Sequence, residues 1–421
     1  MDQRTGTASA VETGTSGVRR ARAVVLAAAV AALVAKTVIA AVTRGPADVR
    51  IFDAFAAAIA RVGPLRIYEH PMPQQPVYNH PPLTGWMLLG FDELRQLGIP
   101  FGSLIRAPAT LADLVSALLV LEILRRRRSL GSATACAVGC ALSPVLLATS
   151  GHHGNTDSVA VMFAVLAAYL LADRRRPLAA GVAAAVAVGV KLIPVVAVPA
   201  LLVAAARGGR PVLVRFAAGL TAALAVVWGP AVATVPEGLW HNVLAYEGGS
   251  ARLWGLVRFA DWAGASDGFT EALHADFPLL FVGVCAAAGV WCAWVRPASP
   301  AYAVALSTTL LLLLSTASAV QYLAWPVVGL FLFGAVGGWL YSAVAGAAAV
   351  VVYAGASAVR WDDWALHLAE AAWLLLAAGI ATGLRRVLAE PPPGADGRPP
   401  AVVPRAATEP APRSAPTAPV P

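Results

Sequence analysis

Long runs of apolar residues recur along this chain and constrain its fold more than any other feature. Residues 23–42 and 211–234 are each long enough, as helices, to cross a hydrocarbon core of ~30 Å. Only 13% of the residues are charged, which is about half the ~25% found in soluble domains. The sequence therefore predicts an all-α, multi-pass helical membrane protein.

The arginines predict how the chain threads through the membrane. They gather beside the apolar runs, at residues 19–22, 125–128, 174–176, 207–215 and 385–386. Cytoplasmic loops collect such positive residues. Placing every cluster inside predicts about twelve membrane helices with both termini cytoplasmic. The net charge of +8 does not indicate a nucleic-acid partner, because no basic stripe is interleaved with aromatic residues on a polar domain.

Three parts follow from this pattern. Residues 1–22 form a basic cytoplasmic N-terminus that is not a cleavable leader, residues 23–386 form the membrane domain, and residues 387–421 form a disordered cytoplasmic tail rich in Pro and Ala. Outer loops are expected at about 43–103, 150–158 and 235–276. Arginine strongly outnumbers lysine, a usage typical of GC-rich bacterial genomes, so we expect the plasma membrane.

The first outer loop contains two segments with the character of surface helices. Residues 82–97 are too short to cross ~30 Å at ~1.5 Å per residue, and three charged residues interrupt them. Residues 47–61 place Phe52 and Phe55 on one helical face. Both segments are therefore predicted to be amphipathic helices lying in the interface.

Two lysines lie in apolar runs and are the only lysines of the chain. Lys191 interrupts residues 178–206 next to a proline, which predicts a broken helix pair. An ionisable residue in such a run is functional by default, although snorkelling to the surface is an equal alternative. Lys36 lies within a continuous run, so we expect it to snorkel.

The histidines and cysteines give little support for a metal site. His152 and His153 are adjacent, but no third ligand follows at a fixed spacing. All four cysteines fall in apolar segments and are expected to be buried side chains. The prediction is no cofactor and no metal, with a divalent ion as the less favoured alternative.

Four motifs, in order along the chain, resemble the GT-C superfamily of membrane glycosyltransferases. "DVRIFDAF" carries Asp48 followed by aromatics four and seven residues later, and "NHPPLTGW" opens the second surface helix. "GHHGNTDS" resembles a loop of mannosyltransferases that use polyprenyl-phosphate-mannose. The fourth comprises two strings, "KLIPVVAVPALL" and "VQYLAWP", which are similar to later segments of the superfamily.

The resemblance implies an inverting transfer of a hexose, with mannose favoured, from a polyprenyl-phosphate donor at the outer face. It implies Asp48 as the general base, since a carboxylate within hydrogen-bond reach can take the acceptor's proton. Cations stabilise the departing phosphate, and the candidates are Lys191, Arg252 and Arg258. The remaining polar residues are candidates for binding the sugar or donor: His80, His153, Asn155, Asp157, Gln321 and Tyr322.

Other functions stay open at this point. The acceptor is a glycan, lipid, peptide, protein or secreted metabolite. A transporter or a flippase for lipid-linked sugars is the main alternative, although no internal repeat is visible and the polar residues fall on one side. A non-catalytic membrane assembly subunit is the third.

Overall fold

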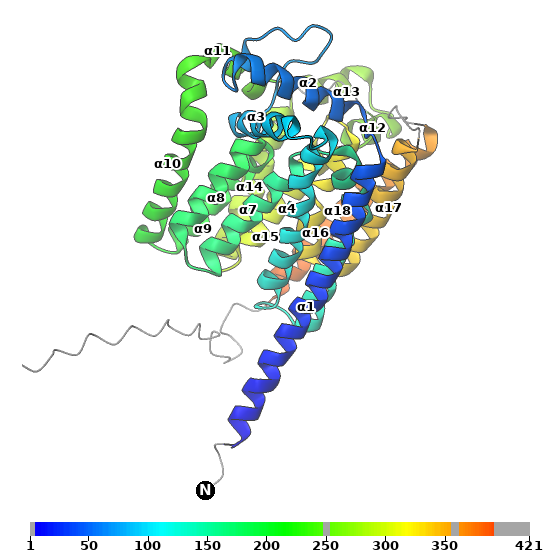
Figure 1. Ribbon diagram of the computed structural model, residues 1–421. Coiled ribbons are helices and arrows are strands. Elements are labelled where there is room, and N and C mark those ends of the chain that lie inside the picture. The colour runs from blue at the N-terminus through cyan, green and yellow to red at the C-terminus, as the bar shows by residue number, and fades with distance from the viewer. Residues whose placement is uncertain (1–4, 247–252, 355–361, 391–421) are drawn as a thin grey trace, which may run out of the picture.

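The computed structural model describes residues 5–246, 253–354 and 362–390. Across these residues the chain is helical and contains no strand (Figure 1). The helices of the first half are α1 (Thr5–Val42), α2 (Ala47–Val62), η1 (Arg66–Tyr68), α3 (Pro82–Gln96), α4 (Phe101–Leu124), α5 (Leu130–Ala141), α6 (Pro144–Ala148), η2 (Thr149–His153), α7 (Asp157–Ala172), α8 (Pro177–Val190), η3 (Ile193–Ala197) and α9 (Val198–Arg207). Those of the second half are α10 (Arg210–Thr234), α11 (Pro236–Leu239), η4 (Trp240–Leu244), α12 (Leu256–Trp262), α13 (Asp267–Ala275), α14 (Pro278–Val295), α15 (Pro300–Leu314), η5 (Val320–Ala324), α16 (Val327–Phe333), α17 (Ala335–Tyr353) and α18 (Asp363–Ala389).

Seven helical segments in the described ranges are long and apolar enough to cross a membrane. They are Ser16–Val42, Phe101–Leu124, Leu130–His153, Arg210–Thr234, Pro278–Val295, Ala335–Tyr353 and Asp363–Ala389. Five shorter apolar helical segments lie among them: Asp157–Ala172, Pro177–Val190, Ile193–Arg207, Pro300–Leu314 and Val320–Phe333. The prediction of a multi-pass helical membrane protein is confirmed at this level.

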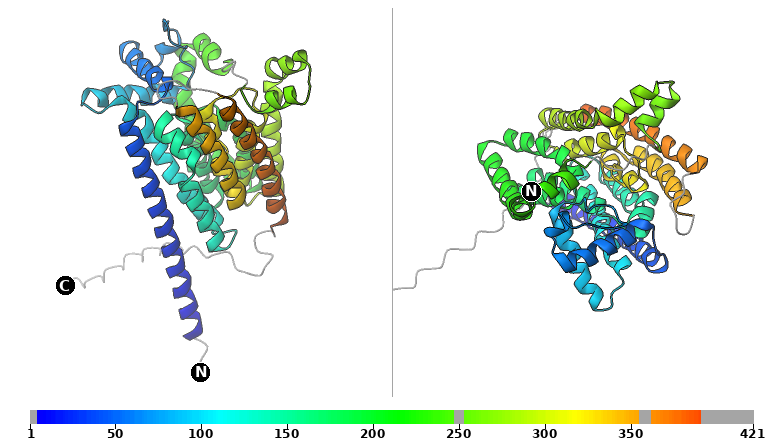
Figure 2. Two further views of the ribbon diagram at one scale, coloured as in Figure 1. Left: turned by 90° about the vertical axis from the view of Figure 1, so that its right-hand side faces the viewer. Right: turned by 90° about the horizontal axis from the view of Figure 1, so that it is seen from above.

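The helices form a bundle around one large apolar core. α8 packs against α7 and α10, α14 against α15, and α17 against α18, while α1 lies along α4. α1 extends well beyond the other helices at its N-terminal end (Figure 2). Gly181 allows α8 and α10 to cross closely, because a Cβ at this position would lie 2.1 Å from the Phe216 carbonyl oxygen of α10.

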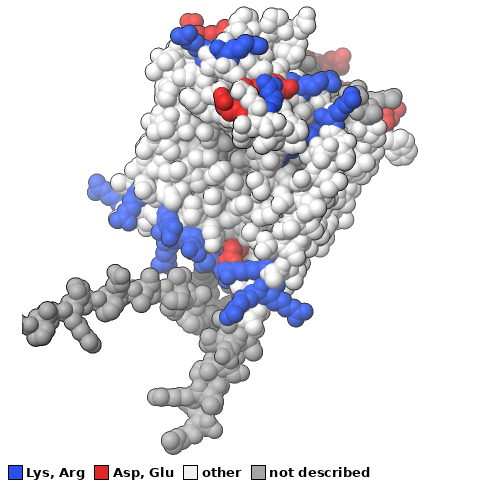
Figure 3. Space-filling view, viewed as in Figure 1, with Lys and Arg blue, Asp and Glu red and all other residues white. Residues whose placement is uncertain are grey.

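Arginines join the helix ends at one end of the bundle. Arg127 forms an ion pair with Asp173 at 3.0 Å and donates a hydrogen bond to Ser299, which joins the ends of α4, α7 and α15. Arg128 pairs with Glu390, immediately after α18, at 2.8 Å. Figure 3 shows charged residues at both ends of the molecule, with a largely uncharged band between them.

A second, smaller core lies at the other end of the bundle. It is built from α2, η1 and α3 with the C-terminal end of α10 and with α11, and includes Phe52, Phe55 and Leu88. Arg95 of α3 pairs with Asp53 of α2 at 2.7 Å, and also pairs with Asp92. Helices are thus present at both segments that the sequence marks as surface helices.

The structure shows how four segments marked in the sequence are built. α8 ends at Val190, immediately before Lys191, so the expected break is present. The loop expected at residues 150–158 is shorter, since a π-helical turn continues to His153 and α7 begins at Asp157. The described residues of the large loop expected at 235–276 form four short helices, α11, η4, α12 and α13. The predicted tail begins inside α18, and residues 391–421 lie outside the described part.

Candidate active site

The segment "GHHG" is shaped by the helices packed against it. A Cβ on Gly151 would lie 3.2 Å from the Cα of Lys36, so only a residue without a side chain fits comfortably against α1 here. Gly154 has φ +74°, in the left-handed region that favours glycine. Between these glycines, His152 approaches Thr43 at 3.1 Å and His153 is almost fully buried.

His153 connects Asp48 to Tyr353. Its Nε2 lies 2.8 Å from Asp48 Oδ2, and its Nδ1 lies 2.7 Å from the Tyr353 hydroxyl. An ionised carboxylate only accepts hydrogen bonds. A neutral His153 must therefore donate from Nε2 to Asp48 and accept at Nδ1 from Tyr353. The result is a continuous chain, Tyr353–His153–Asp48, drawn from α17, η2 and α2.

The environment of Asp48 keeps its carboxyl ionised and accessible. Burial acts to raise the pKa of Asp48, but the hydrogen bond from His153 and the charge of Lys191 outweigh it, so the pKa lies below its ordinary value. The side chain of Asp48 is 39% exposed, whereas that of His153 is 3% exposed. One face of the carboxylate is thus held by His153, and the other is open.

Lys191 lies at the helix break and faces Asp157, the first residue of α7. Its Nζ is 3.2 Å from Asp157 Oδ1, in an orientation outside hydrogen-bond limits, so the contact is an ion pair. The carboxylate at the start of α7 is also favoured by the helix dipole. The Lys191 side chain is 23% exposed and therefore reachable.

Several buried polar atoms around this pair have no hydrogen-bond partner among the described residues. Both amide atoms of Asn155, the Thr156 hydroxyl and Asp157 Oδ2 are in this position. Buried polar groups are normally paired, and each unpaired one carries a desolvation cost. Such a group of unpaired donors and acceptors is what a site for a polar ligand requires.

His80 lies close enough to Lys191 and Asp48 to interact with both electrostatically. Its ring stacks on Phe52 with centroids 4.8 Å apart, and its carbonyl accepts a hydrogen bond from Tyr68. Burial, together with the charge of Lys191, holds the pKa of His80 well below its ordinary value, against the opposing effect of Asp48. His80 is therefore a neutral imidazole whose Nδ1 has no partner in the described residues.

The "NHPPLTGW" segment is anchored rather than free. Thr84 is fully buried and donates a hydrogen bond to the carbonyl of Val190 at 2.8 Å, at the C-terminal end of α8. Tyr322 of η5 interacts electrostatically with Lys191, Asp157 and Asp48. Gln321 lies beside Tyr322 and is half-buried. Residues from α2, α3, α7, η5 and the break after α8 are thus brought together.

The region between α10 and α14 is placed differently. Arg258 of α12 lies 3.5 Å from Asp261 and stacks over Trp262. Its neighbour Gly255 donates its N–H to Glu370 of α18 at 2.7 Å. No contact between Arg258 and Lys191 or Asp48 is present in the described ranges. Arg252 lies outside the described residues, so the phosphate roles of both arginines stay predictions.

Two residues at the site were missed from the sequence. Tyr353 is a single tyrosine at the end of an apolar run and carries no signal. Arg106, however, follows the same rule that singled out Lys191. It is 1% exposed and donates hydrogen bonds to the carbonyls of His152, Ala40 and Thr43, holding the end of α1 against η2.

The expectation for Lys36 is wrong. Lys36 does not extend to the surface but is 1% exposed and pairs with Asp113 of α4 at 2.6 Å. Lys36 is buried beside Asp113 between two packed helices, where each charge neutralises the other. The ammonium therefore pairs with this carboxylate and does not reach the membrane interface.

No group of three or more His, Cys, Asp or Glu side chains that could hold a metal ion occurs in the ranges that the structure describes. Asp48 and His153 form one His–carboxylate pair, which provides two of the ligands that a typical site needs. Metal independence stays a prediction.

One comparison with known proteins bears on this site. Residues 79–233 match the family model for dolichyl-phosphate-mannose-protein mannosyltransferase. The resemblance to GT-C glycosyltransferases is confirmed over these residues, which include His80, His153, Asn155, Asp157 and Lys191. No curated protein matches the chain. The match supports a membrane glycosyltransferase of the mannosyltransferase type that uses a lipid-linked sugar.

Proposed function

We propose that this chain transfers mannose from a polyprenyl-phosphate donor to an acceptor hydroxyl on the outer face of the plasma membrane. The observation that carries the proposal is the accessible Asp48 carboxylate, held by His153 in the same polar site as Lys191. Two of these three residues belong to the segment that matches the mannosyltransferase family model.

Asp48 acts as the general base in this proposal. The acceptor oxygen forms a bond to the anomeric carbon while its proton passes to Asp48. The bond from that carbon to the phosphate oxygen breaks, and the electron pair leaves with polyprenyl phosphate. A single displacement inverts the anomeric configuration. His153 orients the carboxylate and keeps it ionised before the step.

Lys191 stabilises the departing phosphate. Its ammonium lies beside Asp157 and is partly exposed, so an incoming phosphate can share it. Arg252 and Arg258 of the second outer loop are the further phosphate contacts in this proposal. Asn155, Asp157, His80, Gln321 and Tyr322 bind the sugar, because several of them have polar atoms without partners in the described residues.

The membrane placement follows from the arginine-rich end of the bundle. We place that end in the cytoplasm, with both termini, because positive residues collect there. The five shorter apolar helical segments then cross with the seven long ones, giving about twelve passes. α2 and α3 lie in the outer interface, where the lipid-linked donor meets Asp48.

The test uses protein in lipid nanodiscs with radiolabelled polyprenyl-phosphate-mannose and polyprenyl-phosphate-glucose, and a membrane extract as acceptor. Wild type is expected to transfer label from the mannose donor, with and without EDTA. Asp48→Asn should lower the rate ~10²–10⁴-fold, the contribution of a general base. Asp53→Asn is the matched control, since Asp53 lies on the same helix but pairs with Arg95.

Three results would contradict the proposal in different ways. Equal loss in Asp48→Asn and Asp53→Asn would show that α2, rather than one carboxylate, is being perturbed. Transfer from the glucose donor alone would change the sugar. Movement of an intact labelled donor across the bilayer, without transfer to any acceptor, would favour the flippase.

A further inference from the structure

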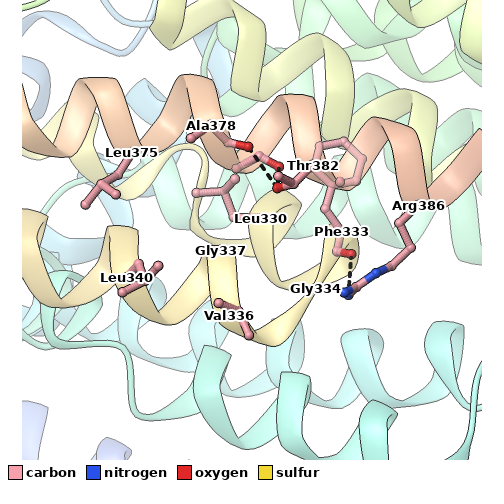
Figure 4. Close-up of a pocket in the computed structure, with 12 residues that line it drawn as sticks. Leu330, Phe333, Gly334, Val336, Gly337, Leu340, Leu375, Ala378, Thr382 and Arg386 are labelled. Carbon is pink, nitrogen blue, oxygen red and sulfur yellow. Dashed lines mark hydrogen bonds between the residues drawn. The ribbon is translucent and has the colours of Figure 1, made fainter.

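A groove lies on the side of the bundle, at the end that carries the arginine cluster. It has a volume of about 350 Å³ and is formed by α16, α17 and α18. Figure 4 shows Arg386 at one end of the groove, next to Gly334 and Phe333, and Leu375 with Leu340 toward the other. The groove is thus long, apolar along its length and basic at one end.

Glycines create the space. Gly334, Gly337, Gly379 and Gly383 all line the groove. A Cβ on Gly337 would lie 3.4 Å from the Cα of Gly379, so α17 and α18 approach closely at this point. Leucine, valine and phenylalanine side chains form the apolar walls of the groove.

The groove opens toward lipid rather than water. Val336 is 70% exposed and Leu340 is 53% exposed, and both lie on α17, one of the seven long apolar helices. Exposed apolar side chains on a membrane-crossing helix face the hydrocarbon. An occupant must therefore enter from the bilayer and present an apolar chain to the groove.

The polar groups of the groove define the other half of the ligand. The Thr382 hydroxyl is already used, because it donates to the carbonyls of Ala378 and Gly379 in its own helix. Arg386 is exposed, and the one hydrogen bond that it makes within the described part of the chain, to the carbonyl of Phe333, is 3.5 Å long. Arg128 donates to the same carbonyl and forms an ion pair with Glu390, and no other carboxylate pairs with either arginine in the described ranges.

We propose that this groove binds an anionic phospholipid, with an acyl chain along α17 and α18 and the phosphate against Arg386. Two guanidinium groups and one carboxylate leave a net positive charge at its mouth, which complements a phosphodiester. The ligand belongs to the leaflet at the arginine-rich end. It is distinct from the sugar donor, because Asp48 and Lys191 lie at the opposite end of the bundle.

The experiment measures bound lipid by native mass spectrometry, with purified protein offered dioleoyl-phosphatidylglycerol or dioleoyl-phosphatidylcholine. Wild type should retain one phosphatidylglycerol about fivefold more than phosphatidylcholine. Arg386→Gln should remove that preference. Arg385→Gln is the matched control, since Arg385 is adjacent and exposed but does not line the groove.

A second variant tests the apolar half without disturbing the packing. Ala378 lines the groove and is exposed, so Ala378→Phe fills the space from the lipid side. It should lower retention of both lipids and leave the thermal midpoint of the lipid-free protein unchanged. Equal retention of the two lipids by wild type would overturn the proposal. So would equal loss in Arg385→Gln and Arg386→Gln, or full retention in Ala378→Phe.

Discussion

The two lysines of this chain both face an aspartate, and the two pairs are built in opposite ways. Lys36 and Asp113 are 1% and 3% exposed and hydrogen-bonded at 2.6 Å, between α1 and α4. Lys191 and Asp157 meet at 3.2 Å without hydrogen-bond geometry, and Lys191 is 23% exposed. We call the first a closed pair, because its two charged groups are buried and hydrogen-bonded to each other. We call the second an open pair, because the Asp157 carboxylate oxygens have no hydrogen-bond partner in the described ranges.

The surroundings of the two pairs reinforce the difference. The Lys191 pair is next to Asn155 and Thr156, whose buried polar atoms have no partner in the described ranges. The Lys36 pair lies between α1 and α4, and Gly151 packs directly against Lys36. We therefore expect the Lys36–Asp113 pair to stabilise the fold and the Lys191–Asp157 pair to be available to a ligand.

The largest expected effect is on stability and comes from the closed pair. Lys36→Met leaves Asp113 as an uncompensated buried charge, and breaking such a pair costs ~3–5 kcal/mol. Unfolding in graded SDS should show this loss. The double variant Lys36→Met with Asp113→Leu should recover most of it, because an apolar replacement of both partners is often neutral. Transfer per folded molecule should stay near wild type; a specific loss of turnover would contradict a purely structural pair.

The open pair should show the opposite pattern. Lys191→Met is expected to lower kcat by ~10²–10³-fold, the effect of removing one group that stabilises developing charge. Its effect on unfolding should be smaller than that of Lys36→Met, because the dipole of α7 also supports Asp157. Steady-state transfer and SDS unfolding on the same preparations measure both quantities. Reversal of the two patterns would make Lys191 structural.

The chain Tyr353–His153–Asp48 predicts a shift in pH dependence. Asp48 must be ionised to accept a proton, so kcat/KM falls as pH drops through the pKa of Asp48. In wild type that pKa lies below its ordinary value, with burial opposed by His153 and Lys191. His153→Ala removes the hydrogen bond and leaves burial, so the acid limb should move to higher pH. Tyr353→Phe should move it less in the same direction. An unchanged acid limb in His153→Ala would separate His153 from Asp48.

Single residues of the site were predictable, but their pairings were not. Asp48 and His153 stand out because they lie in motifs that resemble those of the GT-C superfamily. Lys191 stands out because it is ionisable within an apolar run, and the break there follows from the proline nearby. The partners of His153 lie 105 and 200 residues away, and such distances are closed by packing between helices rather than by local pattern.

Lys36 shows why the burial of a charged residue could not be predicted from the local sequence. Its position in a continuous helix fits both snorkelling and burial, and the choice depends on a partner 77 residues away on α4. Asp113 and Arg106 lie seven residues apart, so they share the face of α4 that contacts α1. Arg106 and Asp113 together form a charged stripe on this face, a pattern that indicates a polar contact between two membrane helices.

The smallest effect concerns how the open pair is held in place. Thr84 donates to the carbonyl of Val190, the residue before Lys191, so Thr84→Val removes one buried hydrogen bond. The expected cost is ~1 kcal/mol of stability, with a few-fold fall in transfer because the helix break loses an anchor. Thr221→Val is the matched control, since Thr221 is exposed and bonds within its own helix. Equal behaviour of the two variants would mean that α3 does not position Lys191, and that Lys191 depends on its own helix break alone.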